Sequence, residues 1–318
     1  MARHQYGIFA EGTRAHHHLE ATIRDGVDDA ALSGALVAVR AANADHRTTG
    51  GVNLVIGLGP DAWDRVRAGR SAQVIRDFPG YESPDGAFRA PATQRDIWLW
   101  AHGPSTDVVF DVVRQAAAAL APVAVLELDV TGFTYHDSRD LTGFVDGSAN
   151  PFLDEAPDLA VIPDGEPGEG GSCAMTMRFR HDLDAFGALA EHEQELVFGR
   201  TKRDSVELDD DVKPADAHIA LAEVEGPDGE ELEVYRRSVP WANAVEQGLQ
   251  FVSFGRDVDR FDQQLRALYG VDEPTLVDRL QQYTTALSGS FWFCPSVEDL
   301  DAIAPVPDHG LGRAINDR

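Results

Sequence analysis

Three segments far apart in the sequence carry side chains that could act together in one reaction. Asp146 lies in the run LTGFVDGSANPF (141–152), where two glycines near one acid indicate a backbone that turns tightly or approaches something flat and large. His218 follows a long acidic loop, and Arg236 begins the run RRSVPW. A carboxylate, an imidazole and a guanidinium are the groups that could handle a small polar oxidant at a metal centre.

Each of these residues also has an ordinary structural interpretation. The segment around Asp146 could be an Asx-type turn that joins two halves of the chain. A lone histidine such as His218 is more often a hydrogen-bonded structural residue than a ligand, and Arg236 taken singly could be a charge on a strand face. The residue types alone leave these alternatives open.

Other candidate sites are weaker. The run GLGP (57–60) lacks the third glycine of a dinucleotide-binding loop and favours a tight turn that opens a helix. His16 and His18 would share one strand face, but no carboxylate has a spacing that favours a metal site, so a polar strand face is expected. Cys173 and Cys294 lie in apolar runs typical of small buried side chains rather than of a thiolate ligand or nucleophile, and two cysteines exclude a disulfide scaffold.

The elements that must position these residues repeat in the two halves of the chain. The first half predicts strands at 16–23, 52–58, 97–102 and 123–130, and helices at 28–44, 60–68 and 107–120. The second half predicts strands at 173–180, 231–238, 249–255 and 290–294, and helices at 182–198, 258–268 and 275–287. This order predicts an α+β fold of two ferredoxin-like (βαββαβ) modules with antiparallel sheets packed together.

The predicted modules set the domain organisation. The first is expected over residues 1–140, and the second, with most of the candidate site, over 141–305. Segment 156–172 is rich in turn residues and favours an insertion or surface loop, and 306–318 is typical of a flexible tail.

Composition narrows the classes of partner. The 318 residues hold 54 Asp and Glu against 27 Lys and Arg, a net charge of −27, which argues against binding nucleic acid or an anionic membrane. The N-terminal residues lack the apolar core of a secretory signal, and no run of 18 apolar residues occurs. The expected location is therefore the cytoplasm, with no membrane partner.

Beyond these patterns, the chain resembles the dye-decolourising peroxidase family. GFVDG (143–147) matches the family's G-x-x-D-G motif, and further matches follow in the family's order over roughly residues 5–305. They are PATQRDIWLW (91–100), EQELVFGRTK (193–202), the isolated His218, RRSVP (236–240) and LSGSFWFCPS (287–296). The compact form resembles the type-B branch, whose fold is a pair of ferredoxin-like modules around one non-covalent b-type haem, held mainly by the C-terminal module.

The resemblance implies roles for individual residues around the haem. His218 would be the proximal iron ligand, and Asp278 would accept a hydrogen bond from its Nδ1–H. On the other face, Asp146 would shuttle the peroxide proton and Arg236 would stabilise the developing charge, with Arg236 the more important of the two. Gly147 would let the backbone approach the haem.

The position two residues after the distal arginine departs from the pattern of many relatives. It is Ser238, where many type-B members have asparagine, so the distal hydrogen bonds should differ. The neighbouring Arg237 is expected to point to the opposite strand face.

The resemblance also implies an activity and partners. The expected activity is reduction of hydrogen peroxide through a high-valent ferryl intermediate, with oxidation of dyes, phenols or other one-electron donors by way of surface Trp or Tyr residues. The alternative is a haem- or porphyrin-handling protein with incidental peroxidase turnover. A homo-oligomer is expected, and the family includes cargo of protein nanocompartments.

Overall fold

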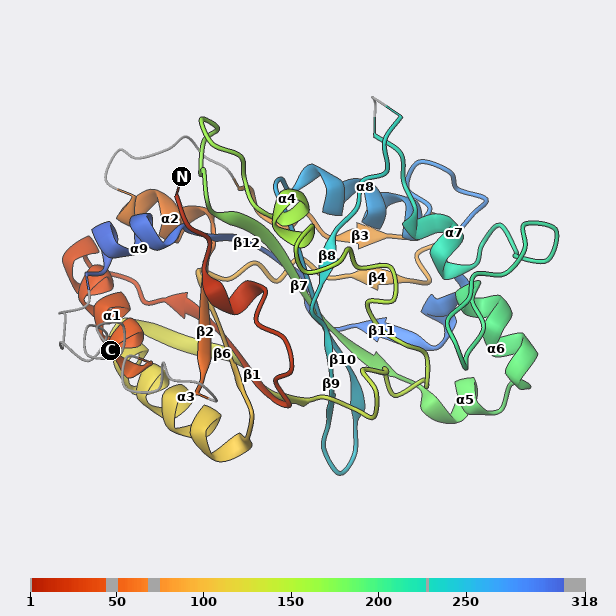
Figure 1. Cartoon of the computed structure of the whole chain (residues 1–318), viewed down its shortest axis with the longest axis horizontal. Helices are drawn as coiled ribbons and strands as arrows, with labels where there is room; N and C mark the ends of the chain where they lie inside the picture. Colours follow the sequence, from red (N-terminus) through yellow and green to blue (C-terminus); the bar gives the residue numbers. More distant parts are fainter. Residues whose placement is uncertain (1, 44–50, 68–74, 227–228, 306–318) are drawn as a thin grey trace.

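The computed structural model describes residues 2–43, 51–67, 75–226 and 229–305 and shows helices arranged around a core of antiparallel strands (Figure 1). The helices are α1 (Asp29–Ala42), α2 (Pro60–Val66), α3 (Thr106–Leu120), α4 (Ala156–Ala160), α5 (Leu183–Gly187), α6 (Glu191–Phe198), α7 (His218–Ala222), α8 (Asp259–Leu268) and α9 (Val297–Ile303), with 3-10 turns η1 (Tyr6–Ile8) and η3 (Arg279–Gln282). The strands of the main sheet are β1 (Ala15–Ile23), β2 (Asn53–Leu58), β5 (Ile97–Gly103), β6 (Ala124–Phe133), β7 (Ser172–His181), β8 (Tyr235–Arg236), β9 (Val239–Ala242), β10 (Gln247–Gly255), β11 (Thr284–Ala286) and β12 (Ser290–Cys294), and β3 (Tyr81–Glu82) and β4 (Arg89–Ala90) form a separate pair.

The main sheet closes on itself. In the first half the strand order is β2-β5-β1-β6, and in the second half β9-β10-β7-β12, with every pair antiparallel. The two halves meet at both edges, where β12 pairs with β2 and β6 pairs with β9. An α+β fold with antiparallel sheets is confirmed, and the two sheets are joined edge to edge into a ring whose inward side chains fill its interior.

The predicted strands and helices of the first half follow from burial periodicity. β5 (IWLWAHG) is buried along its whole length, so that Trp98, Trp100 and His102 share one face and point into the ring of strands. The buried positions of α3 recur at helical spacing, and this stripe packs on α1 and on strands β1 and β5. Figure 1 shows α1 and α3 at one end of the molecule and α5, α6 and α7 at the other.

Three expectations for the second half are wrong in detail. The helix predicted over 182–198 is two helices, α5 and α6, separated at 188–190. Of the strand predicted at 231–238, only β8 pairs with β10. The helix predicted at 275–287 is the 3-10 turn η3 followed by β11, because the Asp278 carboxylate accepts from Leu280 N and the next residues pair with the edge of β7.

The segment 156–172 is more than a surface loop. It begins with α4, whose Ala156 and Ala160 are fully buried, and Ile162 packs in the main core. The predicted tail over 306–318 lies outside the described residues. No helix in the described ranges is long and apolar enough to cross a membrane.

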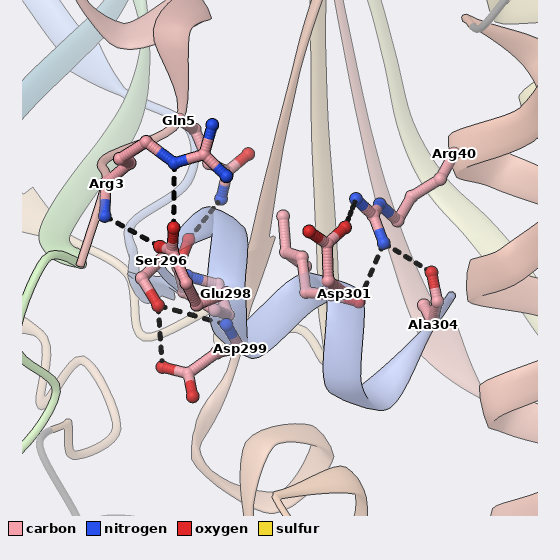
Figure 2. Close-up of polar contacts among 10 residues, drawn as sticks. Arg3, Gln5, Arg40, Ser296, Glu298, Asp299, Asp301 and Ala304 are labelled. Carbon is pink, nitrogen blue, oxygen red and sulfur yellow. Dashed lines mark hydrogen bonds and ion pairs between the residues drawn. The ribbon is translucent and has the colours of Figure 1, made fainter. Parts of the chain in front are cut away.

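The end of the second half is tied back to the first. Arg3 contacts Glu298 of α9 through its backbone N and its guanidinium, both at 2.7 Å, and Arg40 of α1 lies 2.6 Å from Asp301 (Figure 2). Arg40 also donates to backbone carbonyls at the end of α9. These contacts fix α9 against the first half beside the β12–β2 junction.

Candidate active site

One cavity of about 280 Å³ collects the predicted site residues. It lies between the outer face of strands β7 and β10 and the segments that carry residues 140–149, α7, α8 and residues 278–284. Alternate residues of the two strands, among them Met175, Met177 and Phe251, form an apolar wall. Polar and charged side chains line the rest of the cavity, so that an apolar wall faces groups able to bind or move protons.

His218 begins α7 and is oriented by a buried acid. Its Nδ1 lies 2.7 Å from Oδ2 of Asp278, which is only 4% exposed. The other carboxylate oxygen of Asp278 accepts from Leu280 N at 2.8 Å, so the acid itself is fixed. Because the Asp278 carboxylate accepts a hydrogen bond from Nδ1–H, the free lone pair of His218 is on Nε2, the tautomer required of an imidazole metal ligand.

Asp146 and Arg236 are brought together by a residue that the sequence did not single out. Asn150 donates from Nδ2 to Arg236 O at 2.7 Å and accepts from Arg236 N at 2.9 Å, which joins the 141–152 loop to β8. Gly147, between Asp146 and Asn150, has φ +71°, a conformation that favours glycine. A Cβ there would also approach the Asn150 amide nitrogen at 2.9 Å, so glycine is needed for this clamp.

Opposing effects act on the pKa of Asp146, and their sum raises it. Burial raises the pKa of Asp146, and the negative charge of Asp140 raises it further. The positive charge of the nearby Arg236 guanidinium lowers this pKa. The Ser238 hydroxyl hydrogen-bonds the carboxylate and lowers the pKa. The pKa of Asp146 is therefore above that of an ordinary aspartate, which makes its carboxyl group a better proton carrier.

The structure brings most of the predicted site residues together. Five line the one cavity, namely Asp146, Gly147, His218, Arg236 and Asp278. Ser238 lies behind them and reaches the site through Asp146.

Arg237 points to the opposite strand face, as predicted. Its guanidinium donates to the carbonyl oxygens of Ile8 and Ala10 at 2.6 and 2.7 Å. Arg236 and Arg237 therefore serve different faces of the same strand.

The weaker candidates are placed elsewhere. His16 and His18 do share a face, but they are 4% and 0% exposed and point into the strand ring, so the expected polar strand face is wrong. Cys173 and Cys294 are fully buried, and burial raises both thiol pKa values, Cys173 to about 12. Both cysteines are the inert apolar side chains that the sequence predicted.

The donor set fits a haem. His218 offers an Nε2 lone pair that can bind a metal, and the buried Nε of Arg236 has no hydrogen-bond partner among the described residues. Apolar walls complete a site for a flat apolar group with one nitrogen ligand and a cationic donor nearby.

Comparison with known proteins settles the family. The model of the Dyp-type peroxidase N-terminal domain matches residues 5–134, and that of the C-terminal domain matches residues 137–299. The chain belongs to the Dyp-type peroxidase family. A dye-decolorizing peroxidase from Mycolicibacterium paratuberculosis is 36% identical over 93% of this chain and 82% of its own length.

Solved structures of family members have the same fold. The encapsulated DyP-type peroxidase from Mycobacterium smegmatis has a TM-score of 0.88 at 32% identity, covering 96% of this chain and all of that one (100%). A variant of Rhodococcus jostii RHA1 DypB in complex with haem has a TM-score of 0.87 at 31% identity, covering 94% and 98%. The resemblance that the sequence motifs carried is thereby confirmed.

Proposed function

We propose that the chain is a haem-dependent peroxidase that reduces hydrogen peroxide and oxidises dyes, phenols or other one-electron donors. The observation that carries the proposal is the single cavity that gathers the His218–Asp278 pair and the Asp146–Arg236 pair. The family membership and the haem-bound relative support it. A b-type haem bound here supplies an iron that exchanges electrons with peroxide and with the donor.

Each residue has a stated task. His218 Nε2 would hold the iron, while Asp278 keeps the proton on Nδ1 and raises the basicity of the ring. Asp146 would take a proton from one oxygen of hydrogen peroxide and return it to the departing oxygen as water forms. The Arg236 guanidinium would donate hydrogen bonds to the oxygen that gains negative charge, since its Nε–H bonds to nothing in the described part of the chain.

The supporting residues would keep the proton-transfer group in place. Ser238 bonds the charged form of Asp146, and Asn150 fixes the Asp146 loop to the backbone of Arg236. Gly147 would let that loop lie close to the haem face. With a net charge of −27, the surface favours cationic or neutral donors over anionic dyes.

Two measurements on the purified, haem-loaded protein test this function. Hydrogen peroxide should change the Soret and visible bands, and a phenolic donor should restore them with turnover. A protein that acts in haem handling would instead pass haem quickly to an apo-acceptor and turn over slowly. Faster transfer than turnover, or no spectral response, would contradict the peroxidase assignment.

We infer further that the two halves are ferredoxin-like modules over residues 1–140 and 141–305. The two strand orders, β6-β1-β5-β2 and β12-β7-β10-β9, follow one scheme. With the short strands β8 and β11 left aside, the four main strands of each half lie in the order four, one, three, two. A cytoplasmic location, a homo-oligomer and packaging in a nanocompartment remain proposals. An encapsulated relative supports the last of these.

A further inference from the structure

The tryptophans are all inside the protein. The five occur at positions 63, 98, 100, 241 and 292, and none is more than 2% exposed. The expectation that surface Trp or Tyr residues pass electrons to donors is therefore wrong for tryptophan, while for tyrosine, of which Tyr6 is exposed, it stays a prediction. Three of the five instead form one stack within the ring of strands, and this stack has no task in the peroxide chemistry described above.

The stack joins strands from both halves of the chain. Trp98 lies between Trp100 and Trp292, with ring centroids 6.3 and 6.2 Å away and interplanar angles of 9° and 26°. His18 stacks on Trp98 at 6.1 Å and on Trp100 at 5.8 Å, and Phe254 lies 6.1 Å from each of these two rings. The indoles are thus in near-continuous contact through aromatic groups.

One end of the stack has a relay of hydrogen bonds that leads to a buried acid. Trp292 donates from Nε1 to Thr176 Oγ1 at 2.8 Å, and Thr176 donates from Oγ1 to Glu20 Oε1 at 2.8 Å. Glu20 is 2% exposed, and burial raises its pKa to about 7, although Thr176 and the charge of Arg95 lower it. Near neutral pH this carboxyl group can therefore take up a proton that comes through Thr176.

The other end has an imidazole acceptor. Trp100 donates from Nε1 to His16 Nδ1 at 3.3 Å. The other ring nitrogen of His16 lies 3.2 Å from the Thr13 carbonyl, which can only accept, so Nε2 carries the proton and Nδ1 is free to accept. Burial lowers the pKa of His16 to about 4, which keeps the ring neutral at rest.

The middle of the stack has no such acceptor. Trp98 Nε1 is buried without a hydrogen-bond partner among the described residues. An oxidised indole loses its proton only where a base can receive it. Trp98 could therefore pass an electron but not trap an oxidising equivalent, whereas Trp100 and Trp292 could do both.

The stack and the peroxide cavity share a wall one sheet thick. Met175 and Phe251 of β7 and β10 line the cavity. Thr176 and Phe254 lie one and three residues further along the same strands, on the opposite face, and contact the stack. The two arginines at the end of β8 are divided in the same way between cavity and stack. Arg236 lines the cavity, whereas the guanidinium of Arg237, the next residue, lies 5.1 Å from the centroid of the Trp100 ring.

We propose that Trp98, Trp100 and Trp292 are an internal redox relay that gives electrons to the peroxide-derived oxidant in the cavity when no external donor is available, with Glu20 and His16 receiving the indole protons. The proposal rests on the peroxidase function. One electron leaves Trp292 and reduces the oxidant by one equivalent. Its Nε1–H bond breaks, Thr176 takes that proton while it gives its own to the Glu20 carboxylate, and a neutral indolyl radical and a carboxylic acid remain.

The parallel step at the other end balances in the same way. One electron leaves Trp100, and its Nε1 proton moves to His16 Nδ1 to give an imidazolium. A one-electron donor of the peroxidase reaction later returns the electron, and the proton moves back. The relay would spare the cavity from oxidative damage during intervals without donor.

The test uses the haem-loaded protein, which is mixed with one equivalent of hydrogen peroxide in the absence of a donor and frozen before the reaction is complete. Electron paramagnetic resonance on protein with ring-deuterated tryptophan identifies a tryptophan radical by the collapse of its hyperfine structure. We expect this signal in the wild type and its loss in Trp98→Phe, which interrupts the stack. Trp63→Phe is the matched control: Trp63 is also 0% exposed, but its ring packs on Phe293 at 4.7 Å, away from the stack.

Two more variants keep the test decisive if Trp98→Phe does not fold. Trp292→Phe should remove the part of the signal that arises from the acid-coupled indole. Glu20→Gln keeps the shape and can still accept from Thr176, but it cannot take up the proton. It should therefore abolish the deprotonated indolyl form at this end while leaving the fold intact.

The outcomes separate the relay from the peroxidase function. A visible spectrum that does not respond to peroxide would overturn both. A spectrum that responds in wild type without any tryptophan radical, or a radical unchanged in Trp98→Phe and Trp292→Phe, would overturn the relay alone. An equal loss of signal in Trp63→Phe would do the same, since the signal would then not depend specifically on the stack, which this variant leaves intact.

Discussion

Replacing Asp278 by asparagine is the sharpest single change to the proposed iron ligand, because the structure leaves the amide no satisfactory orientation. The carboxylate accepts two hydrogen bonds, one from His218 Nδ1 at 2.7 Å and one from Leu280 N at 2.8 Å. An amide has only one acceptor oxygen. Either His218 Nδ1–H or Leu280 N–H must then face the amide NH2 group, which cannot accept a hydrogen bond. Alternatively, His218 carries its proton on Nε2 and loses the lone pair that would bind iron.

The expected cost follows from either outcome. A buried donor left without an acceptor costs about 1–3 kcal/mol. Loss of an outer partner of a metal ligand lowers metal affinity about 10–100-fold, which at 1.4 kcal/mol per tenfold is about 1.4–2.8 kcal/mol. We therefore expect Asp278→Asn to bind haem about 10–100-fold more weakly, and to hold the iron at a higher reduction potential because the imidazole is less basic.

Titration of the apoprotein with haem, followed at the Soret band, measures the affinity, and a redox titration measures the potential. Asp272→Asn is the matched control: Asp272 lies in the same stretch of chain, but its side chain is 61% exposed and pairs with Arg266. The control should match the wild type in both measurements. Unchanged affinity and potential in Asp278→Asn would refute the assignment of this pair.

Three further changes test other parts of the structure. Arg236→Leu should slow the reaction with peroxide about 10²–10³-fold in stopped-flow absorption at equal haem content, since a preorganised donor is lost; a wild-type rate would contradict its role. Ser238→Ala removes a hydrogen bond to the charged form of Asp146, so the pKa of Asp146 should rise and the acid limb of the pH–rate profile should move to higher pH; a shift to lower pH would count against this contact. Burial raises the pKa of Glu20 from 4.5 to about 7, so the folded chain keeps this proton to higher pH than the unfolded chain and loses stability as the pH rises through that window. The free energy of unfolding of Glu20→Gln minus that of the wild type, measured with urea, should therefore rise by about 3 kcal/mol between about pH 4 and pH 8. A difference that does not change with pH would contradict a buried, titrating acid at this position.

Much of the fold follows from local patterns. The fully apolar run of β5 and the helical spacing of buried residues in α3 identify those elements without tertiary information. The segment around η3 and β11 could not be predicted in this way. Its conformation depends on the Asp278 side chain capping a local turn and on Thr284–Ala286 pairing with β7. The second of these contacts joins residues about a hundred positions apart, so no local pattern indicates it.

The site shows the same division. Asp146, His218 and Arg236 were identifiable by residue type and by motif, and all three line one cavity. Asn150 was not, because its amide acts on the backbone of Arg236, 86 residues away. The one signal that could have singled it out is its place directly after the Gly147 turn, where asparagine commonly bonds to nearby backbone. The burial of every tryptophan likewise depends on the closed sheet rather than on composition.

The most direct test of the central claim is a resonance Raman spectrum of the reduced, haem-loaded protein. Wild type should show an iron–imidazole stretching band, since His218 is proposed to hold the iron through Nε2. The band should be absent in His218→Ala and shifted to lower frequency in Asp278→Asn, where the ring is less basic. An unchanged band in His218→Ala would show that another side chain binds the iron and would contradict the account of this cavity.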